Sequence, residues 1–336
     1  MHKCLVMFSG GLDSVVAAHL LKNQGLEVTA LHFLLPFFSG INYPCDQVKE
    51  YANTLNIPIL IEEEGVEFLN MIKTPAFGFG KNANPCLDCR IHRLKKAAKI
   101  MENNGFAFLA TGEVIGQRPM SQRIDCLNRA EKISGLKGRL LRPLSAKKLP
   151  PTEAELSGIV DREKLLDISG RGRKTQLDYA RHHRLKYATP AGGCLLTNQE
   201  TATRYYELLQ HNEDFSLPDF KLLAYGRHFR LSPTFKLVVS RNESENTILD
   251  HIRNNNHTFL VMKDVTGPVG LGIGTLNDKL LNQSASILAR FSKARDKAEV
   301  NVEATIEKRS TLIRVRPARE EEICSLRIVS THIRAS

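Results

Sequence analysis

Apolar residues in the first 112 positions follow two alternating patterns. Short apolar runs occur at residues 3–8, 27–35, 58–61 and 106–110 and predict buried strands. Between them, apolar residues recur every three or four positions at residues 12–23, 46–55 and 87–104, which predicts helices. Alternating strands and helices are typical of a parallel sheet with right-handed crossovers. We therefore expect a doubly wound α/β domain with helices on both faces of the sheet.

The pattern changes after residue 112. Residues 113–151 hold glycine, proline and basic residues with little periodicity and predict loops with short elements, followed by helical stretches at 163–166, 174–183 and 199–210. Turn formers and a proline at residues 212–219 predict a linker, so we expect one domain at 1–214 and a second at 215–336. In the second, strands at 235–240, 258–263, 299–305 and 311–316 and an amphipathic helix at 277–293 predict a smaller α/β domain.

Positive charge is concentrated in two parts of the chain. The net charge is +11, and residues 86–186 carry 22 basic and 11 acidic side chains, whereas residues 219–336 carry 19 and 13. Phosphate contacts dominate the affinity of proteins for nucleic acids, so this asymmetry predicts a polyanionic partner such as RNA. A solvated basic surface without a partner is the alternative.

Targeting signals and disulfides are not expected. No apolar run is long enough to span a membrane, and residues 1–8 lead directly into glycines rather than into a signal-peptide cleavage site. We therefore expect the chain to stay in the cytosol, without membrane contact. An odd number of cysteines, seven, argues against a disulfide framework and favours metal binding or catalysis for any that cluster.

The segment SGGLDS at residues 9–14, here called the glycine loop, joins the first predicted strand to the first predicted helix. Gly10 and Gly11 allow a tight turn whose N–H groups point at one anion, and the helix adds its positive N-terminal end. Ser9 and Ser14 can donate hydroxyl groups, while Asp13 can hold Mg²⁺ against phosphate oxygens. The loop is not a Walker A motif, because the Gly-Lys-Ser/Thr ending is absent.

Three cysteines stand in distinctive surroundings. Cys86 and Cys89 follow Asn-Pro at the start of the long basic helix, where a helix N-terminus and nearby arginines favour the thiolate. Cys194 ends the segment TPAGGC, far along the chain. Three thiolates can hold a [4Fe–4S] cluster with one iron left open for sulfide. A persulfide pair without iron, and a zinc or structural role, remain alternatives; Cys4, Cys45, Cys126 and Cys324 receive no role.

Together, SGGLDS, NPCLDC, ATGE (residues 110–113) and TPAGGC resemble the PP-loop ATP-pyrophosphatase superfamily, in its tRNA 2-thiouridylase-like branch. The resemblance covers roughly residues 1–210 and implies a Rossmann-like fold that binds ATP, with Thr111 and Gly112 added to the glycine loop. It implies adenylation of a base oxygen, followed by sulfur transfer through Cys89 and Cys194, with sulfide or a cysteine desulfurase relay as donor. Cys86 is an addition that resembles the iron–sulfur-dependent thiolation enzymes. Neither the nucleotide nor the tRNA position follows from the sequence, and a homodimer is left open.

Basic side chains suggest where tRNA binds. Near the predicted site these are Arg90, Arg93, Arg118, Arg171, Arg173 and Lys174. In the second domain, Arg227 and Arg230 interleave with aromatic residues, a pattern suited to stacking on bases while contacting phosphates. Residues 221–230 and the strands after them resemble the RNA-binding domain of NFACT proteins.

Two other functions compete with tRNA thiolation. A PP-loop ligase or amidotransferase acting on a small molecule would need no RNA, and the basic segments argue against it. A non-catalytic RNA-binding protein would not need an intact glycine loop or three such cysteines.

Overall fold

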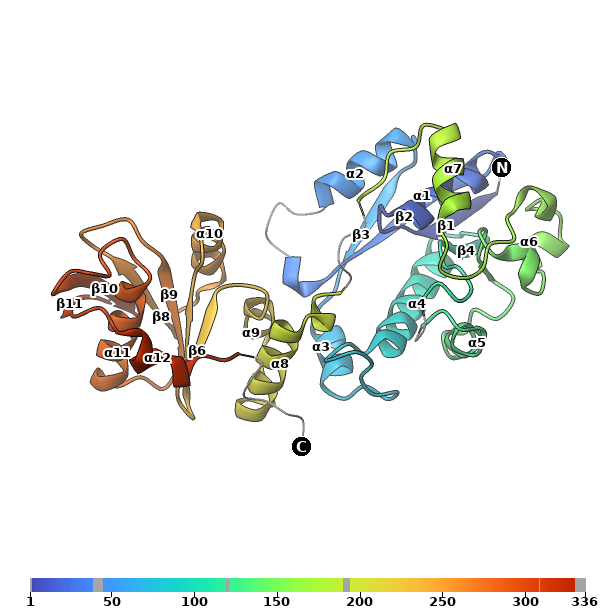
Figure 1. Ribbon diagram of the computed structural model, residues 1–336. Helices are drawn as coiled ribbons and strands as arrows, with labels where there is room; N and C mark the ends of the chain where they lie inside the picture. The colour runs from blue at the N-terminus through green and yellow to red at the C-terminus, as the bar shows by residue number, and fades with distance from the viewer. Residues whose placement is uncertain (1, 39–44, 119–120, 190–193, 308, 330–336) are drawn as a thin grey trace. The chain divides into compact units, whose positions relative to one another are not determined.

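The computed structural model describes residues 2–38, 45–118, 121–189, 194–307 and 309–329 (Figure 1). The chain divides into unit 1, Met1–Cys194, and unit 2, Leu195–Ser336. Among the described residues, no helix is long and apolar enough to cross a lipid bilayer.

Unit 1 is built on a parallel sheet in the order β3-β2-β1-β4-β5. Its strands are β1 (Lys3–Met7), β2 (Glu27–Leu34), β3 (Ile59–Glu63), β4 (Phe108–Thr111) and β5 (Leu140–Leu141). Its longer helices are α1 (Leu12–Lys22), α2 (Cys45–Thr54), α3 (Val66–Lys73), α4 (Cys86–Asn103), α5 (Ile124–Ile133) and α7 (Lys174–His182), and α6 (Glu153–Leu156) is a single turn.

Alternate residues of β1 pack on opposite faces of this sheet. Val6 joins Val15 of α1 in one core cluster, whereas Leu5 joins Leu94 of α4 in another. In Figure 1, α1, α2 and α7 accordingly lie on one side of the sheet, and α4 and α5 lie on the other. The doubly wound fold predicted from the sequence is confirmed. The strand order reverses between β1 and β4, and open sheets of this kind bind ligands at such a switch point.

Unit 2 contains an antiparallel sheet in the order β11-β10-β8-β9-β7-β6. Its strands are β6 (Arg227–Ser232), β7 (Phe235–Val239), β8 (His257–Met262), β9 (Val269–Gly274), β10 (Val300–Ile306) and β11 (Arg309–Val315). Its helices are α8 (Gln199–His211), α9 (Leu217–Leu222), α10 (Glu243–Ile252), α11 (Asp278–Arg290) and α12 (Glu320–Ile323). Leu288 of α11 packs with Leu237 and Leu260, whereas Leu249 of α10 packs with Val238, so the two helices cover opposite faces.

Helix α8 lies in unit 2, although the linker expected at residues 212–219 would assign it to the first domain. The physical reason is a buried group of charges. Glu207 of α8 accepts hydrogen bonds from Lys236 Nζ at 2.8 Å and from Arg230 Nε at 2.6 Å. Both partners belong to strands of unit 2, Lys236 to β7 and Arg230 to β6. The domain boundary expected between residues 214 and 215 stays a prediction.

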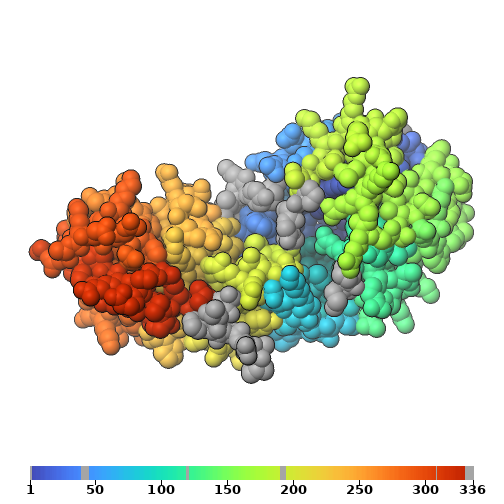
Figure 2. Space-filling view, viewed as in Figure 1, coloured from blue at the N-terminus to red at the C-terminus, as the bar shows by residue number. Residues whose placement is uncertain are grey.

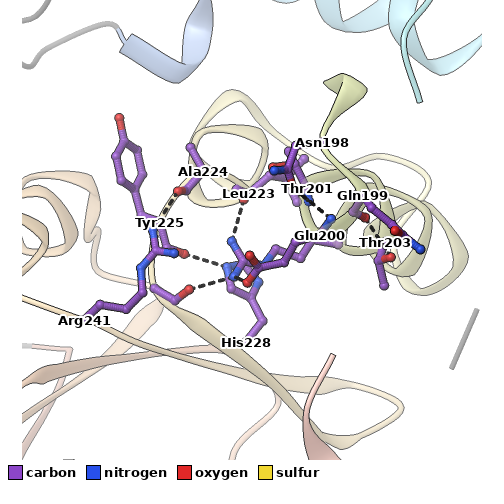
Figure 3. A network of polar contacts seen from close by, with 12 residues as sticks. Asn198, Gln199, Glu200, Thr201, Thr203, Leu223, Ala224, Tyr225, His228 and Arg241 are labelled. Atoms are coloured by element: carbon purple, nitrogen blue, oxygen red, sulfur yellow. Dashed lines mark hydrogen bonds and ion pairs between the residues drawn. The ribbon is translucent and has the colours of Figure 1, made fainter. Parts of the chain in front are cut away.

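A second polar network joins α8 to the turn before β6 (Figure 3). Arg204 of α8 donates to Leu223 O at 2.9 Å and to Gly226 O at 2.8 Å, and it pairs with Glu200. His228 Nε2 donates to the carbonyl oxygens of Leu222 and Tyr225. Burial, with Lys236 and Arg204 nearby, holds the pKa of His228 well below its usual value, so this imidazole is neutral. The network fixes the residues that lead into β6.

The buried Glu207–Lys236 pair gives a test of this packing. Lys236→Met removes the ammonium from Glu207, and breaking a buried pair from one side typically costs about 3 kcal/mol of unfolding free energy. Lys263→Met is the matched control, because Lys263 forms an exposed pair with Glu303 that is worth less than about 1 kcal/mol. Urea unfolding of both full-length variants compares the two. Equal stability of the two variants would contradict a structural role for Glu207.

Candidate active site

The glycine loop lies between β1 and α1. Gly10 has a φ of +75°, and a Cβ there would lie 2.9 Å from the Tyr51 ring, so only glycine fits. Ser14 Oγ donates to Gly11 O at 2.8 Å and lies 3.2 Å from Ser9 Oγ. Gly11 is the N-cap of α1 and supplies no side-chain cap, which leaves the first N–H groups of the helix available to an anion.

The end of β4 passes very close to the start of α1. A Cβ on Gly112 would lie 2.6 Å from the carbonyl carbon and oxygen of Asp13 and from the nitrogen of Ser14. No real Cβ tolerates such a distance to backbone, so glycine is required at this position. The approach places Thr111 and Gly112 beside the glycine loop, although about 100 residues separate the two segments in the sequence.

A cavity of about 370 Å³ opens where these segments meet. Six of the seven residues expected to bind ATP line it, and the seventh, Gly10, shapes the turn. A further wall comes from the segment after β4 and from residues 173, 188 and 189. The lining residues are Met7, Ser9, Gly11, Leu12, Asp13, Ser14, Thr111, Gly112, Glu113, Gln117, Arg118, Gln122, Arg173, Ala188 and Thr189.

Asp13 has a partner that the sequence did not indicate. Gln176 of α7 is fully buried, and its Nε2 donates to Asp13 Oδ1 at 3.3 Å. This bond orients the carboxylate and leaves its second oxygen for a cation. The predicted helix at 174–183 was the only available signal, because nothing in the sequence pairs position 176 with position 13.

Glu113 connects the cavity wall to α4. Its two carboxylate oxygens pair with Arg90 Nε at 2.8 Å and with Arg142 Nε at 3.1 Å. Burial alone would raise the pKa of Glu113, but the two guanidinium groups outweigh burial and hold this pKa below its usual range. Arg90 also donates to Ser121 O. Because Arg90 follows Cys89 directly, the cavity wall and the cysteine-bearing turn are held together by one group of charges.

Cys86 and Cys89 occupy the first turn of α4, as expected, with Pro85 as N-cap. The expectation that this turn favours the thiolate is wrong for Cys89. Burial raises the pKa of the Cys89 thiol, and Glu64 and Cys86 raise it too; Arg93 and Arg90 lower it but do not compensate. Without a bound cation, Cys89 is therefore a protonated thiol at neutral pH.

Cys194 is partly buried at the end of unit 1, and residues 190–193 of the TPAGGC segment lie outside the described residues. In the part of the chain that the structure describes, no three histidine, cysteine, aspartate or glutamate side chains lie close enough to hold a metal ion. Cys194 is thus not gathered with Cys86 and Cys89 in this structure. The thiols of Cys86 and Cys89 are suitable ligands for iron, and the three-cysteine cluster stays a prediction.

The basic residues expected to bind RNA fall into two groups. Arg118, Arg171, Arg173 and Lys174 are exposed, and the segment leading into α7 lies at the surface in Figure 2. The others have protein partners: Arg90 pairs with Glu113, Arg230 with Glu207, Arg93 lies 3.7 Å from Glu64, and Arg227 lies 4.7 Å from the centre of the Phe291 ring. Phe229 is fully buried in the core and is not available to stack on a base.

Known families match both units. Residues 1–148 match the model of the thiamine biosynthesis protein (ThiI) family, and residues 226–327 match that of the NFACT protein RNA binding domain. These matches confirm the two family resemblances expected from the motifs.

Individual proteins resemble parts of the chain. It is 37% identical over 87 residues to a tRNA-specific 2-thiouridylase MnmA from Desulfosudis oleivorans, which covers 25% of this chain and 24% of that protein. It is 32% identical over 148 residues to a probable tRNA sulfurtransferase from Lysinibacillus sphaericus, with 42% and 34% covered. The solved U34-tRNA thiolase NcsA from Methanococcus maripaludis, with its [4Fe-4S] cluster, aligns at 19% identity and a TM-score of 0.34 over 66% of this chain and 73% of that one. The chain thus spans a quarter to a third of the length of these two sequence relatives.

The raised pKa of Cys89 predicts its reactivity. In iron-free protein, alkylation of Cys89 by iodoacetamide should increase with pH to a midpoint above the ordinary thiol value of about 8.5, because burial disfavours the thiolate. Arg93→Ala should move the midpoint higher still, since Arg93 stabilises the thiolate, whereas Arg295→Ala in unit 2 should not move it. Peptide mass spectrometry after timed alkylation gives the rates. A midpoint for Cys89 below about 8.5 would show that charge outweighs burial at this position.

Proposed function

We propose that this chain is an ATP-dependent tRNA sulfurtransferase. It would adenylate a carbonyl oxygen of a uracil base and replace that oxygen with sulfur. The observation that carries the proposal is the shared wall: Glu113 lines the cavity of the glycine loop and binds Arg90, the neighbour of Cys89. The residues that would activate the nucleotide and those that would handle sulfur are thereby linked within one unit. The family matches of both units, and the thiolation enzymes among the relatives, support the same reading.

The first step is adenylation. Ser9, Ser14 and the free N–H groups at the start of α1 would bind the pyrophosphate part of ATP. The free oxygen of Asp13, whose other oxygen is held by Gln176, would bind Mg²⁺. The base oxygen attacks the α-phosphorus, the bond to the bridging oxygen breaks, and pyrophosphate leaves with that electron pair. Positioning and charge stabilisation supply the acceleration.

The second step exchanges oxygen for sulfur. Hydrosulfide adds to the activated carbon, AMP leaves with the electron pair of the C–O bond, and the sulfur loses its proton, so no net oxidation occurs. If a persulfide on Cys89 or Cys194 delivers the sulfur instead, the second of these thiols completes the release by forming a disulfide, which an external thiol must reduce. A [4Fe–4S] cluster on Cys86, Cys89 and Cys194 would supply an iron without a protein ligand at which sulfide binds.

Unit 2 would hold the tRNA, and exposed cations of unit 1 would guide its backbone. Arg118, Arg171, Arg173 and Lys174 are the available group in unit 1. We place the reaction in the cytoplasm, with sulfide or a cysteine desulfurase relay as sulfur donor.

Thiolation of tRNA tests the proposal directly. With ATP, Mg²⁺, sulfide and a thiol reductant, the anaerobically purified chain should form a thiolated nucleoside and release one AMP and one pyrophosphate for each sulfur incorporated. Asp13→Asn should lower kcat at least about 100-fold, because it removes charge from the metal ligand, whereas Asp125→Asn, an exposed carboxylate paired with Arg123, should not. Nucleoside mass spectrometry and AMP assays report both products. Pyrophosphate release that needs no RNA, without any thiolated nucleoside, would favour a small-molecule ligase instead.

The cluster is tested separately. The wild-type chain should contain about four irons and four acid-labile sulfides after anaerobic purification or reconstitution. Cys86→Ala, Cys89→Ala and Cys194→Ala should each lose them, whereas Cys126→Ala and Cys324→Ala should keep them. Iron and sulfide assays with absorbance spectra give the content. Thiolation of tRNA by iron-free protein would contradict the cluster and assign sulfur transfer to Cys89 and Cys194.

A further inference from the structure

A groove in unit 2 brings together basic side chains from separate elements. It has a volume of about 900 Å³ and lies between the start of α10, the turn that joins β8 to β9, and the end of α11. Arg227 of β6 lines it, together with Phe291 and Lys293, which directly follow α11. All three residues fall within residues 226–327, the part of the chain that matches the NFACT RNA binding domain.

Arg227 is a half-buried cation that forms no ion pair with any described residue. Its Nη1 donates to Ser240 O at 2.9 Å, and its Cζ lies 4.7 Å from the centre of the Phe291 ring. These contacts fix the position of the guanidinium group, but a carbonyl oxygen and an aromatic ring do not neutralise its charge. Burial removes part of the hydration of such a charge, and an anionic partner compensates for that loss.

The charged groups around Arg227 do not supply this partner. Burial is the largest cause of its lowered pKa; Arg241 and Arg327 lower the pKa further, whereas Glu245 raises it. Glu245 is already engaged, because it accepts a hydrogen bond from Arg241 Nε at 2.8 Å. Arg327 has its own carboxylate partner, Glu320, at 2.8 Å. Positive charge therefore remains in excess around Arg227.

Lys293 adds a second cation two residues after Phe291. Its side chain is exposed and forms no ion pair within the part of the chain that the structure describes. Two carboxylates, Glu243 and Asp264, line the groove as well. Because these carboxylates repel an anion, we expect an anion to bind at Arg227 and Lys293, beside Phe291.

We propose that this end of the groove binds a phosphate group of the tRNA backbone. Arg227 donates N–H groups to the phosphate oxygens, and Lys293 contributes the second positive charge. The planar guanidinium group matches the oxygens of a phosphate, and the phosphate supplies the negative charge that Arg227 lacks. The match to an RNA binding domain favours RNA over an acidic protein as the source of that charge. The inference rests on the proposed role of unit 2 in holding tRNA, and it does not depend on the sulfur chemistry of unit 1.

Fluorescence anisotropy of labelled tRNA with the full-length chain, measured at several KCl concentrations, tests the site. Arg227→Met keeps an apolar side chain against Phe291 but removes the charge, and it should raise the dissociation constant for tRNA about 10-fold. Lys293→Ala should raise it about 3-fold, because its side chain is exposed. Each change should reduce the slope of log Kd against log salt concentration by about one, since one phosphate contact is lost. Arg227→Lys keeps the charge, so it should keep the slope and recover part of the affinity.

Two control variants change similar side chains outside the groove. Arg253→Met is matched to Arg227→Met, because Arg253 lies 4.4 Å from the centre of another phenylalanine ring, Phe259. Lys279→Ala removes an exposed lysine of α11 that does not line the groove. Both controls should bind tRNA as the wild type does. Urea unfolding shows whether each variant is folded, and the exposed Lys293 keeps the test decisive if Arg227→Met is unstable.

Wild-type affinity and salt dependence in both Arg227→Met and Lys293→Ala would overturn the inference. Polyglutamate that binds the wild type as tightly as tRNA does, and that is released by the same two substitutions, would assign the groove to an acidic protein and overturn it as well. In the thiolation assay, both variants should raise KM for tRNA rather than lower kcat. A chain that binds tRNA through this groove but thiolates no nucleoside would contradict the proposed function and leave the phosphate site in place.

Discussion

The site in unit 1 depends on the close approach of two backbones, where Gly112 at the end of β4 crosses the Asp13–Ser14 peptide at the start of α1. A side chain at position 112 would separate β4 from the glycine loop, and the cavity between them would lose a wall. The contact also determines where the chain continues, because the residues after Gly112 bring Glu113, Gln117 and Gln122 around the same cavity. The missing Cβ thus lets the residues after β1 and after β4 line one small cavity.

Ion pairs hold the elements around this backbone contact in place. They also leave fewer unpaired basic side chains at the surface than the sequence suggests. Arg90, Arg142 and Arg230 belong to buried or half-buried ion pairs with Glu113 and Glu207. Such pairs add little net stability compared with apolar packing, but they hold their members in one geometry. Arg118 and Arg173, which are exposed and line the cavity, are therefore better candidates for phosphate contact than the paired arginines, which hold the elements in place.

Much of this arrangement could be read from the sequence, for local reasons. Buried runs and helical spacing reveal the parallel sheet, and SGGLDS reveals the turn after β1 because its chemistry is contiguous. Gln176 could not be identified, since its role arises from a contact with a distant segment. Strand β9 was also missed, because three glycines weaken its pattern; two of them, Gly270 and Gly272, lie closely against Leu288 and Phe235. Helix α8 falls in unit 2, where its Glu207 binds Lys236, and no local pattern in the sequence indicates this contact.

The state of Cys89 shows why a motif alone does not define its chemistry. Its position at a helix N-terminus and its arginine neighbours favour the thiolate, but burial outweighs them and raises its pKa. A bound metal ion reverses this balance, because the ion is the largest local charge and a coordinating thiol loses its proton outright. A protonated Cys89 is therefore consistent with a ligand that becomes anionic only when iron binds. As a persulfide carrier without metal, the same residue would instead need its charge supplied by Arg90 and Arg93, and Arg90 is already paired with Glu113.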